Sequence, residues 1–265
     1  MAKPNLLFLM PDQLRADFLS CYGADFIETP YIDSLCEQGV RYARAIAPSP
    51  VCVPMRSTLL TGLNAIRTGV LNNETYLRPD LEACGIDTWP AILSASGYRT
   101  SAIGKMHFYP WEASMGFEDR IVCEDKRWIH IDDDYQKYLK AKGTRKLHGN
   151  EHGGYQENRG AIVHQHSFED SWDGFVGNEA ANYISHYQDD RPFAMMVGFP
   201  GPHCPYDPSP EYADTYRPED MPAPYPVGPD QPSQFVKQNV QVNLGTWNGV
   251  DYTVFTDEHK ATIRA

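Results

Sequence analysis

The amino-acid sequence predicts an α/β fold with a mostly parallel central sheet and helices on both of its faces. The first observation is a continuous apolar run at residues 5–10, typical of a strand buried on both sides. The second is an alternation of strand-like and helix-like segments, as in repeated β-α-β units. The third is that polar side chains follow several expected strands, where open α/β sheets bind their ligands.

Helix-boundary residues mark the other elements. Proline fits the first turn of a helix, and glycine commonly ends one. Pro30 and Gly39 mark the start and the stop of one expected helix in this way. A loop rich in proline and aspartate is expected at 205–232. The expected helices are 30–38, one with Pro54 in its first turn that stops at Gly62, 88–96, 170–187 and 256–265. Cys52 is expected just ahead of the second of these helices, and the further strands are 40–47, 98–103 and 191–199.

Residues 108–170 are less regular and are rich in aromatic, histidine and charged side chains. A stretch of this length between regular elements is either an insertion that shapes a pocket or a surface excursion. Both interpretations stay open, within a single domain that spans residues 1–265.

Charge and composition restrict the function. The 265 residues include 35 acidic and 23 basic ones, and the formal charge of −12 argues against nucleic acid or an anionic membrane as partner. The apolar run at the N-terminus is too short for a signal-peptide core or a membrane span, so a cytoplasmic location is expected. Six scattered cysteines without a C-x-x-C pair indicate neither a disulfide framework nor a zinc site.

Cys52 is the cysteine whose surroundings suggest chemistry. It precedes Pro54 and Arg56 at the expected start of a helix, where unpaired backbone N–H groups attract anions. Alone, this arrangement is more commonly a buried cysteine beside a capped helix. Two further expected strands end in chemistry-bearing groups, Asp12-Gln13 after the first and Lys105 and His107 after 98–103.

Several motifs together resemble the sulfatase family of the alkaline phosphatase superfamily. Residues 52–56 match its C-x-P-x-R pattern, whose cysteine is oxidised to formylglycine, and residues 3–13, 29–35, 104–108 and 201–206 resemble four more of its segments in order. The resemblance runs from about residue 3 to the C-terminus and implies an alkaline-phosphatase-like fold. Residues 216–222 resemble the related phosphonate monoester hydrolases.

The resemblance implies roles for individual residues. Cys52 would supply the formylglycine, and Arg56 would guide maturation and steady the hydrated aldehyde. Lys105 would bind a sulfate oxygen, His107 would be the base that breaks down the covalent ester, and His203 would hold the sulfate or protonate the leaving group. Asn73 is a weaker candidate for substrate contact.

The implied metal site consists of Asp12, Gln13 and residue 52. Asp12 and Gln13 are hard oxygen ligands, so Ca²⁺ is the first expectation and Mn²⁺, Mg²⁺ and Zn²⁺ are alternatives. Many sulfatases have aspartate where this chain has Gln13, and most have serine where it has Met55. The implied partners are a small anionic ester and a formylglycine-generating enzyme, and an oligomer stays open.

The family's second acidic pair, which completes the metal site, has no convincing counterpart here. Asp257-Glu258-His259 lies on an expected helix. The chain is therefore expected to cover the N-terminal half to two-thirds of the fold, and by itself to bind metal weakly and to expose a sheet edge. Three hypotheses remain: a sulfuric ester hydrolase, a phosphonate or phosphodiester hydrolase with the same nucleophile, and a non-catalytic fragment.

Overall fold

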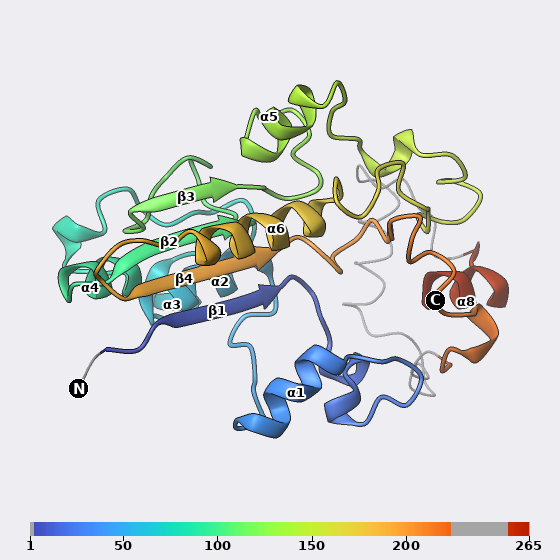
Figure 1. Ribbon diagram of the computed structural model, residues 1–265, viewed down its shortest axis with the longest axis horizontal. Coiled ribbons are helices and arrows are strands. Elements are labelled where there is room, and N and C mark those ends of the chain that lie inside the picture. The colour runs from blue at the N-terminus through green and yellow to red at the C-terminus, as the bar shows by residue number, and fades with distance from the viewer. Residues whose placement is uncertain (1–2, 224–253, 265) are drawn as a thin grey trace. The chain divides into compact units, whose positions relative to one another are not determined.

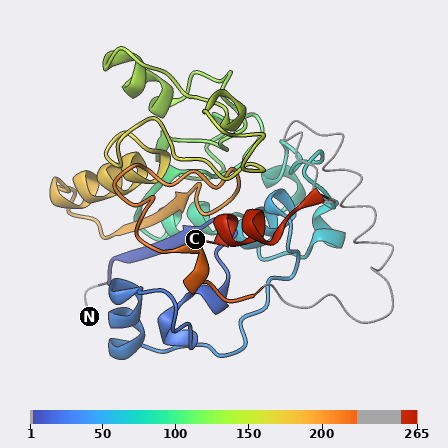
Figure 2. The same cartoon turned by 90° about the vertical axis from the view of Figure 1, so that its right-hand side faces the viewer.

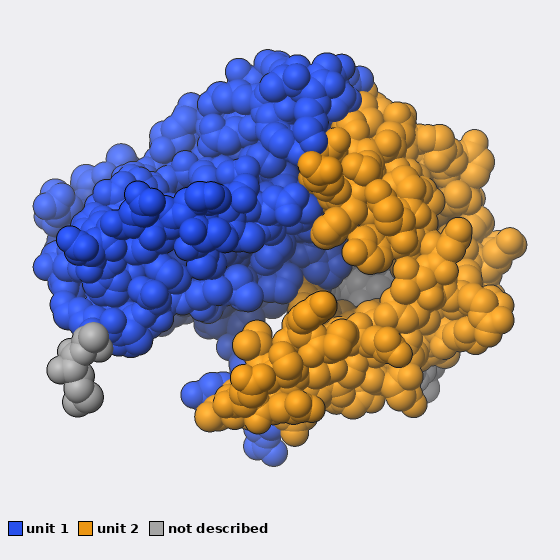
Figure 3. Space-filling view, viewed as in Figure 1, with its two compact units in different colours: residues 1–13, 42–145, 172–202 blue, residues 14–41, 146–171, 203–265 orange. Residues whose placement is uncertain are grey.

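A computed structural model describes residues 3–223 and 254–264, and these residues divide into two compact units (Figure 3). The first unit comprises residues 1–13, 42–145 and 172–202, and the second comprises 14–41, 146–171 and 203–265. All six cysteines are free thiols, as their scattered spacing predicts. No helix in the described parts of the chain is long and apolar enough to cross a bilayer.

The first unit contains a four-stranded sheet in the order β1-β4-β2-β3, in which every pairing is parallel (Figure 1). The strands are β1 (Leu6–Pro11), β2 (Arg99–Gly104), β3 (Asp119–Val122) and β4 (Phe193–Phe199). Three of them were predicted within two residues, and β3 was not. Because the strands are parallel, their carboxyl ends meet at one edge of the sheet.

Helices cover both faces of this sheet, which confirms the predicted fold class. Alternate residues of β4 face opposite ways. Met195 and Val197 pack with α5 (Asp134–Ala141) and α6 (Trp172–Ser185), whereas Met196 packs with α2 (Cys52–Thr61). The other helices on the side of α2 are α3 (Ala65–Thr68) and α4 (Trp89–Ala95), with the short turn η3 (Glu82–Cys84). Figure 1 shows α6 in front of the sheet and α2 and α3 behind it.

Two helix boundaries follow the predicted residues. The Thr88 side chain accepts a hydrogen bond from Ala91 N at the start of α4, and Pro90 lies in its first turn. Gly62 ends α2 with a left-handed φ of 69°. Cys52 is the first residue of α2 rather than the residue before it, because Val51 is the extended N-cap.

The second unit is built from short helices and turns that are joined by long irregular segments. Its helix α1 (Pro30–Gln38) lies beside the turns η1 (Ala16–Phe18) and η2 (Ser20–Tyr22), as Figure 2 shows from a second direction. Farther along the chain, α8 (Asp257–Arg264) contacts η5 (Pro218–Asp220), and η4 (Gly149–Glu151) is a further short turn. Both predicted helices, 30–38 and 256–265, are therefore present.

The strand expected at 40–47 is wrong. These residues are irregular chain with one turn at 43–44, and Val40, Tyr42 and Ile46 are largely exposed. An alternating apolar pattern favours a strand only where a partner strand is available, and none is described for this segment. The stretch 108–170, expected to be less regular, contains a strand of the main sheet at 119–122 and a helix at 134–141. Its role as a pocket-shaping insertion or a surface excursion stays a prediction. Part of the expected loop at 205–232 lies outside the described residues.

The first strand also differs from the prediction that it is buried on both faces. β1 pairs with β4 alone among the described strands, and Leu6, Leu7, Phe8 and Leu9 are each 40–47% exposed. Its sequence is that of a central strand, but its position is at the edge of the sheet. Edge strands of this kind offer unpaired N–H and C=O groups to other chains.

We expect the 265-residue chain to self-associate through β1. Leu7→Lys should reduce this association, because a charge on an edge strand opposes pairing with another chain. Analytical ultracentrifugation over a range of protein concentrations measures the effect. Ile66→Lys, on the exposed face of α3, is the matched control and should leave association unchanged. A monomeric wild-type chain at all concentrations would contradict the expectation.

Candidate active site

The predicted site residues of the first unit gather at the carboxyl edge of its sheet. Asp12 follows β1 and donates its backbone N–H to Phe199 O of β4, at 3.0 Å. Lys105 follows β2 and donates its N–H to Gly198 O, at 2.8 Å. Strands β2 and β4 are so close here that a Cβ on Gly104, which has φ of 91°, would collide with the Gly198 carbonyl oxygen. The glycines thus set the position of Lys105.

Cys52 lies beside Asp12 at the start of α2. Its Sγ is 3.9 Å from Asp12 Oδ2, and the next backbone N–H, of Val53, donates to Asn73 Oδ1 at 3.0 Å. Burial raises the pKa of the Cys52 thiol, against the opposing charge of Lys105. Unmodified Cys52 is therefore a protonated thiol and a poor nucleophile. Asn73 fixes the helix start, and its predicted contact with substrate stays a prediction.

Two buried cations converge on Asp12. The Lys105 ammonium, 1% exposed, contacts Asp12 Oδ2, and Arg56 Nη2 lies 3.4 Å from the same oxygen. Arg56 Nη1 also donates to the Lys105 carbonyl oxygen at 2.5 Å. Fully buried charges are stable only when they are paired and hydrogen-bonded. Lys105 and Arg56 meet this condition through their contacts with Asp12 and with each other. This corner of the first unit therefore concentrates positive charge around one carboxylate.

A second carboxylate, Asp125, completes the network. Its Oδ2 is 2.6 Å from Lys105 Nζ, and its Oδ1 accepts from Arg127 Nε at 2.5 Å. Burial alone would raise the pKa of Asp125, but the hydrogen bond from Arg127 and the charge of Lys105 hold it well below its usual value. Asp125 is therefore ionised, although none of its surface is exposed.

His107 is held as a neutral imidazole. Its backbone, at a left-handed φ of 59°, donates to both carboxylate oxygens of Glu124 at 3.0 Å, and its ring packs edge-on against Trp128. Burial, together with the charge of Lys105, lowers the pKa of His107 to about 3. Above that pH the ring can accept a proton. Gln13, at φ of 66°, is a second site residue in this sparsely populated conformation.

Glu124 and Asp125 were not among the residues that the sequence patterns indicated. Burial also raises the pKa of Glu124, and Arg120 opposes that effect. A weak signal was present, because the two acids follow the apolar residues 121–123 at the end of β3, much as Asp12 follows β1. Without the assignment of β3, nothing in the sequence placed them at the same edge.

His203 belongs to the second unit, where it begins the segment 203–265, and its Nδ1 lies 2.7 Å from the Cys204 carbonyl oxygen. Its participation in a site with Asp12, Cys52 and Lys105 therefore stays a prediction.

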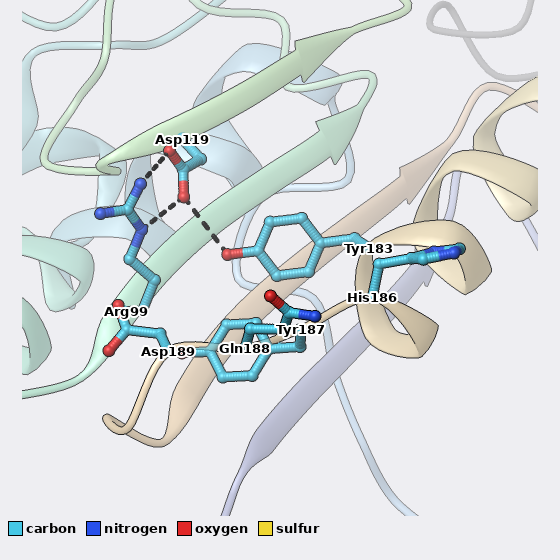
Figure 4. A pocket seen from close by; sticks show the side chains of 7 residues that line it. All are labelled: Arg99, Asp119, Tyr183, His186, Tyr187, Gln188 and Asp189. Carbon is cyan, nitrogen blue, oxygen red and sulfur yellow. Dashed lines mark hydrogen bonds and ion pairs between the residues drawn. The ribbon is translucent and has the colours of Figure 1, made fainter.

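A surface pocket at the other end of the strands is a different feature (Figure 4). Arg99 begins β2 and Asp119 begins β3, and their side chains form a bidentate ion pair, with Nε and Oδ2 2.6 Å apart. Tyr183 donates its hydroxyl to Asp119 at 3.2 Å. Parallel sheets bind ligands at the carboxyl ends of their strands, and these paired side chains lie at the amino ends. We therefore assign them a structural role.

Comparison with known proteins identifies relatives along nearly the whole chain. The family model named Sulfatase matches residues 4–254. An arylsulfatase of Clostridium perfringens is 30% identical over 84% of this chain and 48% of its own length. A choline-sulfatase of Rhizobium meliloti is 30% identical over 81% of this chain and 41% of its own length.

Solved structures share the fold. The phosphonate monoester hydrolase of Agrobacterium radiobacter superimposes with a TM-score of 0.77 at 22% identity, over 99% of this chain and 55% of that one. The chain thus spans about half the length of the relatives it matches. The predicted partial, N-terminal coverage of the fold is confirmed.

The buried neutral His107 should make the stability of the protein depend on pH. In the unfolded chain this histidine takes up a proton near pH 6.5, but in the folded chain only near pH 3. The unfolded state therefore binds more protons between these values, and the free energy of unfolding should fall as pH decreases, by up to about 1.4 kcal/mol per pH unit.

Urea denaturation between pH 7 and pH 5 tests this, with wild type compared to His107→Gln. The variant should lose less stability over that range. His186→Gln, which removes an exposed imidazole from the chain after α6, controls for the loss of a histidine elsewhere. Equal pH slopes for wild type and His107→Gln would contradict the assignment of a neutral buried ring.

Proposed function

The chain belongs to the sulfatase family, and from that premise we propose that it hydrolyses sulfate monoesters through a formylglycine made from Cys52 and a divalent cation. The observation that carries the proposal is the convergence of Cys52, Lys105 and Arg56 on the Asp12 carboxylate. To bind and attack a sulfate ester, an enzyme needs a nucleophile beside concentrated positive charge. This chain is acidic overall, so that charge has to come from a local cluster of cations.

The cation would be held by Asp12, Gln13 and residue 52. The site fits a cation, because the side chain of Asp12 is only 12% exposed and already draws two protein cations to one oxygen. Carboxylate and amide oxygens suit Ca²⁺ first, with Mn²⁺, Mg²⁺ and Zn²⁺ as alternatives. When bound, the metal would polarise a sulfate oxygen and activate the nucleophilic hydroxyl.

The chain's own side chains supply binding and proton transfer. The Lys105 ammonium and the Arg56 guanidinium offer hydrogen bonds and charge to an anionic group next to residue 52. His107, neutral and buried, can accept a proton throughout the neutral pH range. In this proposal His203 holds the sulfate or gives a proton to the departing alcohol, and Asn73 contributes a substrate contact through its amide.

A second candidate function is hydrolysis of phosphonate monoesters or phosphodiesters with the same nucleophile. Gln13 favours it, because this position has one carboxylate fewer than the acidic pair of many sulfatases. Residues 216–222, which resemble phosphonate monoester hydrolases, favour it as well. The 30% identity to an arylsulfatase and a choline-sulfatase supports sulfate as the first choice.

Two aryl esters with the same phenol, one a sulfate and one a phosphonate monoester, separate these functions. We expect kcat/KM of the full-length protein to be higher for the sulfate, and the reverse order would establish the second candidate. Mass spectrometry of the residue-52 peptide should show an aldehyde in place of the thiol. An unconverted Cys52, together with no turnover of either ester, would favour the non-catalytic alternative.

Cys52→Ala should abolish hydrolysis of the aryl sulfate without loss of fold, because it removes the only source of the nucleophile. Steady-state turnover and circular dichroism measure the two effects. Cys84→Ala removes an exposed thiol and should keep wild-type activity. Activity close to wild type in Cys52→Ala would refute the nucleophile assignment.

A further inference from the structure

The Lys105 ammonium lies between two carboxylates that belong to different strand ends. Asp12 follows β1, and Asp125 follows β3. Lys105 Nζ contacts Oδ2 of both, at 2.6 Å in the case of Asp125. Among the described residues these are its two carboxylate partners. The position of the Lys105 ammonium is therefore set by its attraction to both carboxylates.

Asp125 is the fixed member of this pair. Its side chain is fully buried, and Arg127 holds both of its oxygens. The Arg127 backbone N–H and Nε donate to Oδ1 at 3.0 and 2.5 Å, and Arg127 Nη2 donates to Oδ2 at 2.7 Å. Asp125 Oδ2 is thereby fixed beside Lys105 Nζ, and His107 Nδ1 lies 3.9 Å from the same oxygen. A charge-assisted contact with so rigid a partner fixes the ammonium.

Asp12 is the carboxylate of this pair for which several groups compete. Its Oδ2 meets Lys105, Arg56 at 3.4 Å and Cys52 Sγ at 3.9 Å. A divalent cation at Asp12 would compete with the ammonium for the negative charge of this carboxylate, and the competition is strong where both groups are buried. Without Asp125, Lys105 would have Asp12 as its remaining carboxylate partner.

We propose that Asp125 is a positioning residue that holds the Lys105 ammonium, and so keeps the Asp12 carboxylate available to a divalent cation. The inference rests on the proposed function, which makes Asp12 a metal ligand. Asp125 acts through Lys105 and not on the substrate. Its removal should weaken metal binding because Lys105 then pairs with Asp12 alone.

Calorimetric titration of the full-length protein with Mn²⁺ tests the proposal. Asp125→Asn, which keeps the size of the side chain, should weaken Mn²⁺ binding by about tenfold or more, as expected when a buried charge-assisted contact is lost. Asp119→Asn is the matched control, since Asp119 pairs with Arg99 at the opposite end of the same strand. It should leave Mn²⁺ affinity unchanged.

Lys105→Met separates this role from a general effect of charge. Removal of the competing ammonium should tighten Mn²⁺ binding, and Asp125→Asn added to Lys105→Met should then change affinity by less than about threefold, because the two residues act as one unit. If Asp125 acted directly on the cation through its charge, the same tenfold loss would persist in the double variant. If Asp125→Asn does not fold, Lys105→Met alone still decides: unchanged or weaker Mn²⁺ binding overturns the proposal.

The outcomes also separate this inference from the proposed function. Wild-type Mn²⁺ affinity in Asp125→Asn, with aryl sulfate turnover intact in the wild type, overturns the role of Asp125 and leaves the function standing. Mn²⁺ binding that follows the expected pattern without hydrolysis of either ester supports the inference and overturns the function. A wild-type protein that binds no Mn²⁺ overturns both.

Discussion

A buried ammonium shared by two carboxylates determines the chemistry of the first unit. Lys105 is almost fully buried, and its charge is stable there only because Asp12 and Asp125 contact it. The two acids are far apart in sequence and follow strands at opposite edges of the sheet. Their meeting at one ammonium requires the strands to be parallel and in register, so the fold and the site depend on each other.

The charge of Lys105 also affects the pKa values of the neighbouring side chains. Lys105 helps to hold the pKa of Asp125 low and that of His107 low, so that an ionised acid and a neutral base coexist within one buried cluster. It opposes the rise in the pKa of Cys52 that burial causes, but does not cancel it. An unmodified thiol here is therefore a weak nucleophile. That agrees with a family in which the cysteine is first converted to a more reactive group.

Strand β1 connects the site to the stability of the sheet. It ends at Pro11, so Asp12, the metal ligand in our proposal, directly follows a strand that pairs on one side only among the described residues. Its leucines and phenylalanine are nearly half exposed, although the sequence is one that sheets normally bury. A strand that paired in parallel with this edge would bring its own carboxyl end next to Asp12, and an antiparallel one would bring its amino end.

The sequence by itself determined the features that depend on local pattern. Apolar runs identified β1 and β4, and the segment after Gly97 identified β2. Proline and glycine located α1 and the end of α2, and the motifs around Asp12, Cys52, Lys105 and His107 indicated the family. The prediction of a strand failed for residues 40–47, for which the described part of the chain offers no partner strand. It also missed β3, which is only four residues long and begins with two charged ones. Only the tertiary structure placed Glu124 and Asp125 beside His107 and Lys105, because pairing between strands that are distant in sequence leaves no local signal. Burial and the approach of charges, which set each pKa here, likewise exist only after the strands have paired.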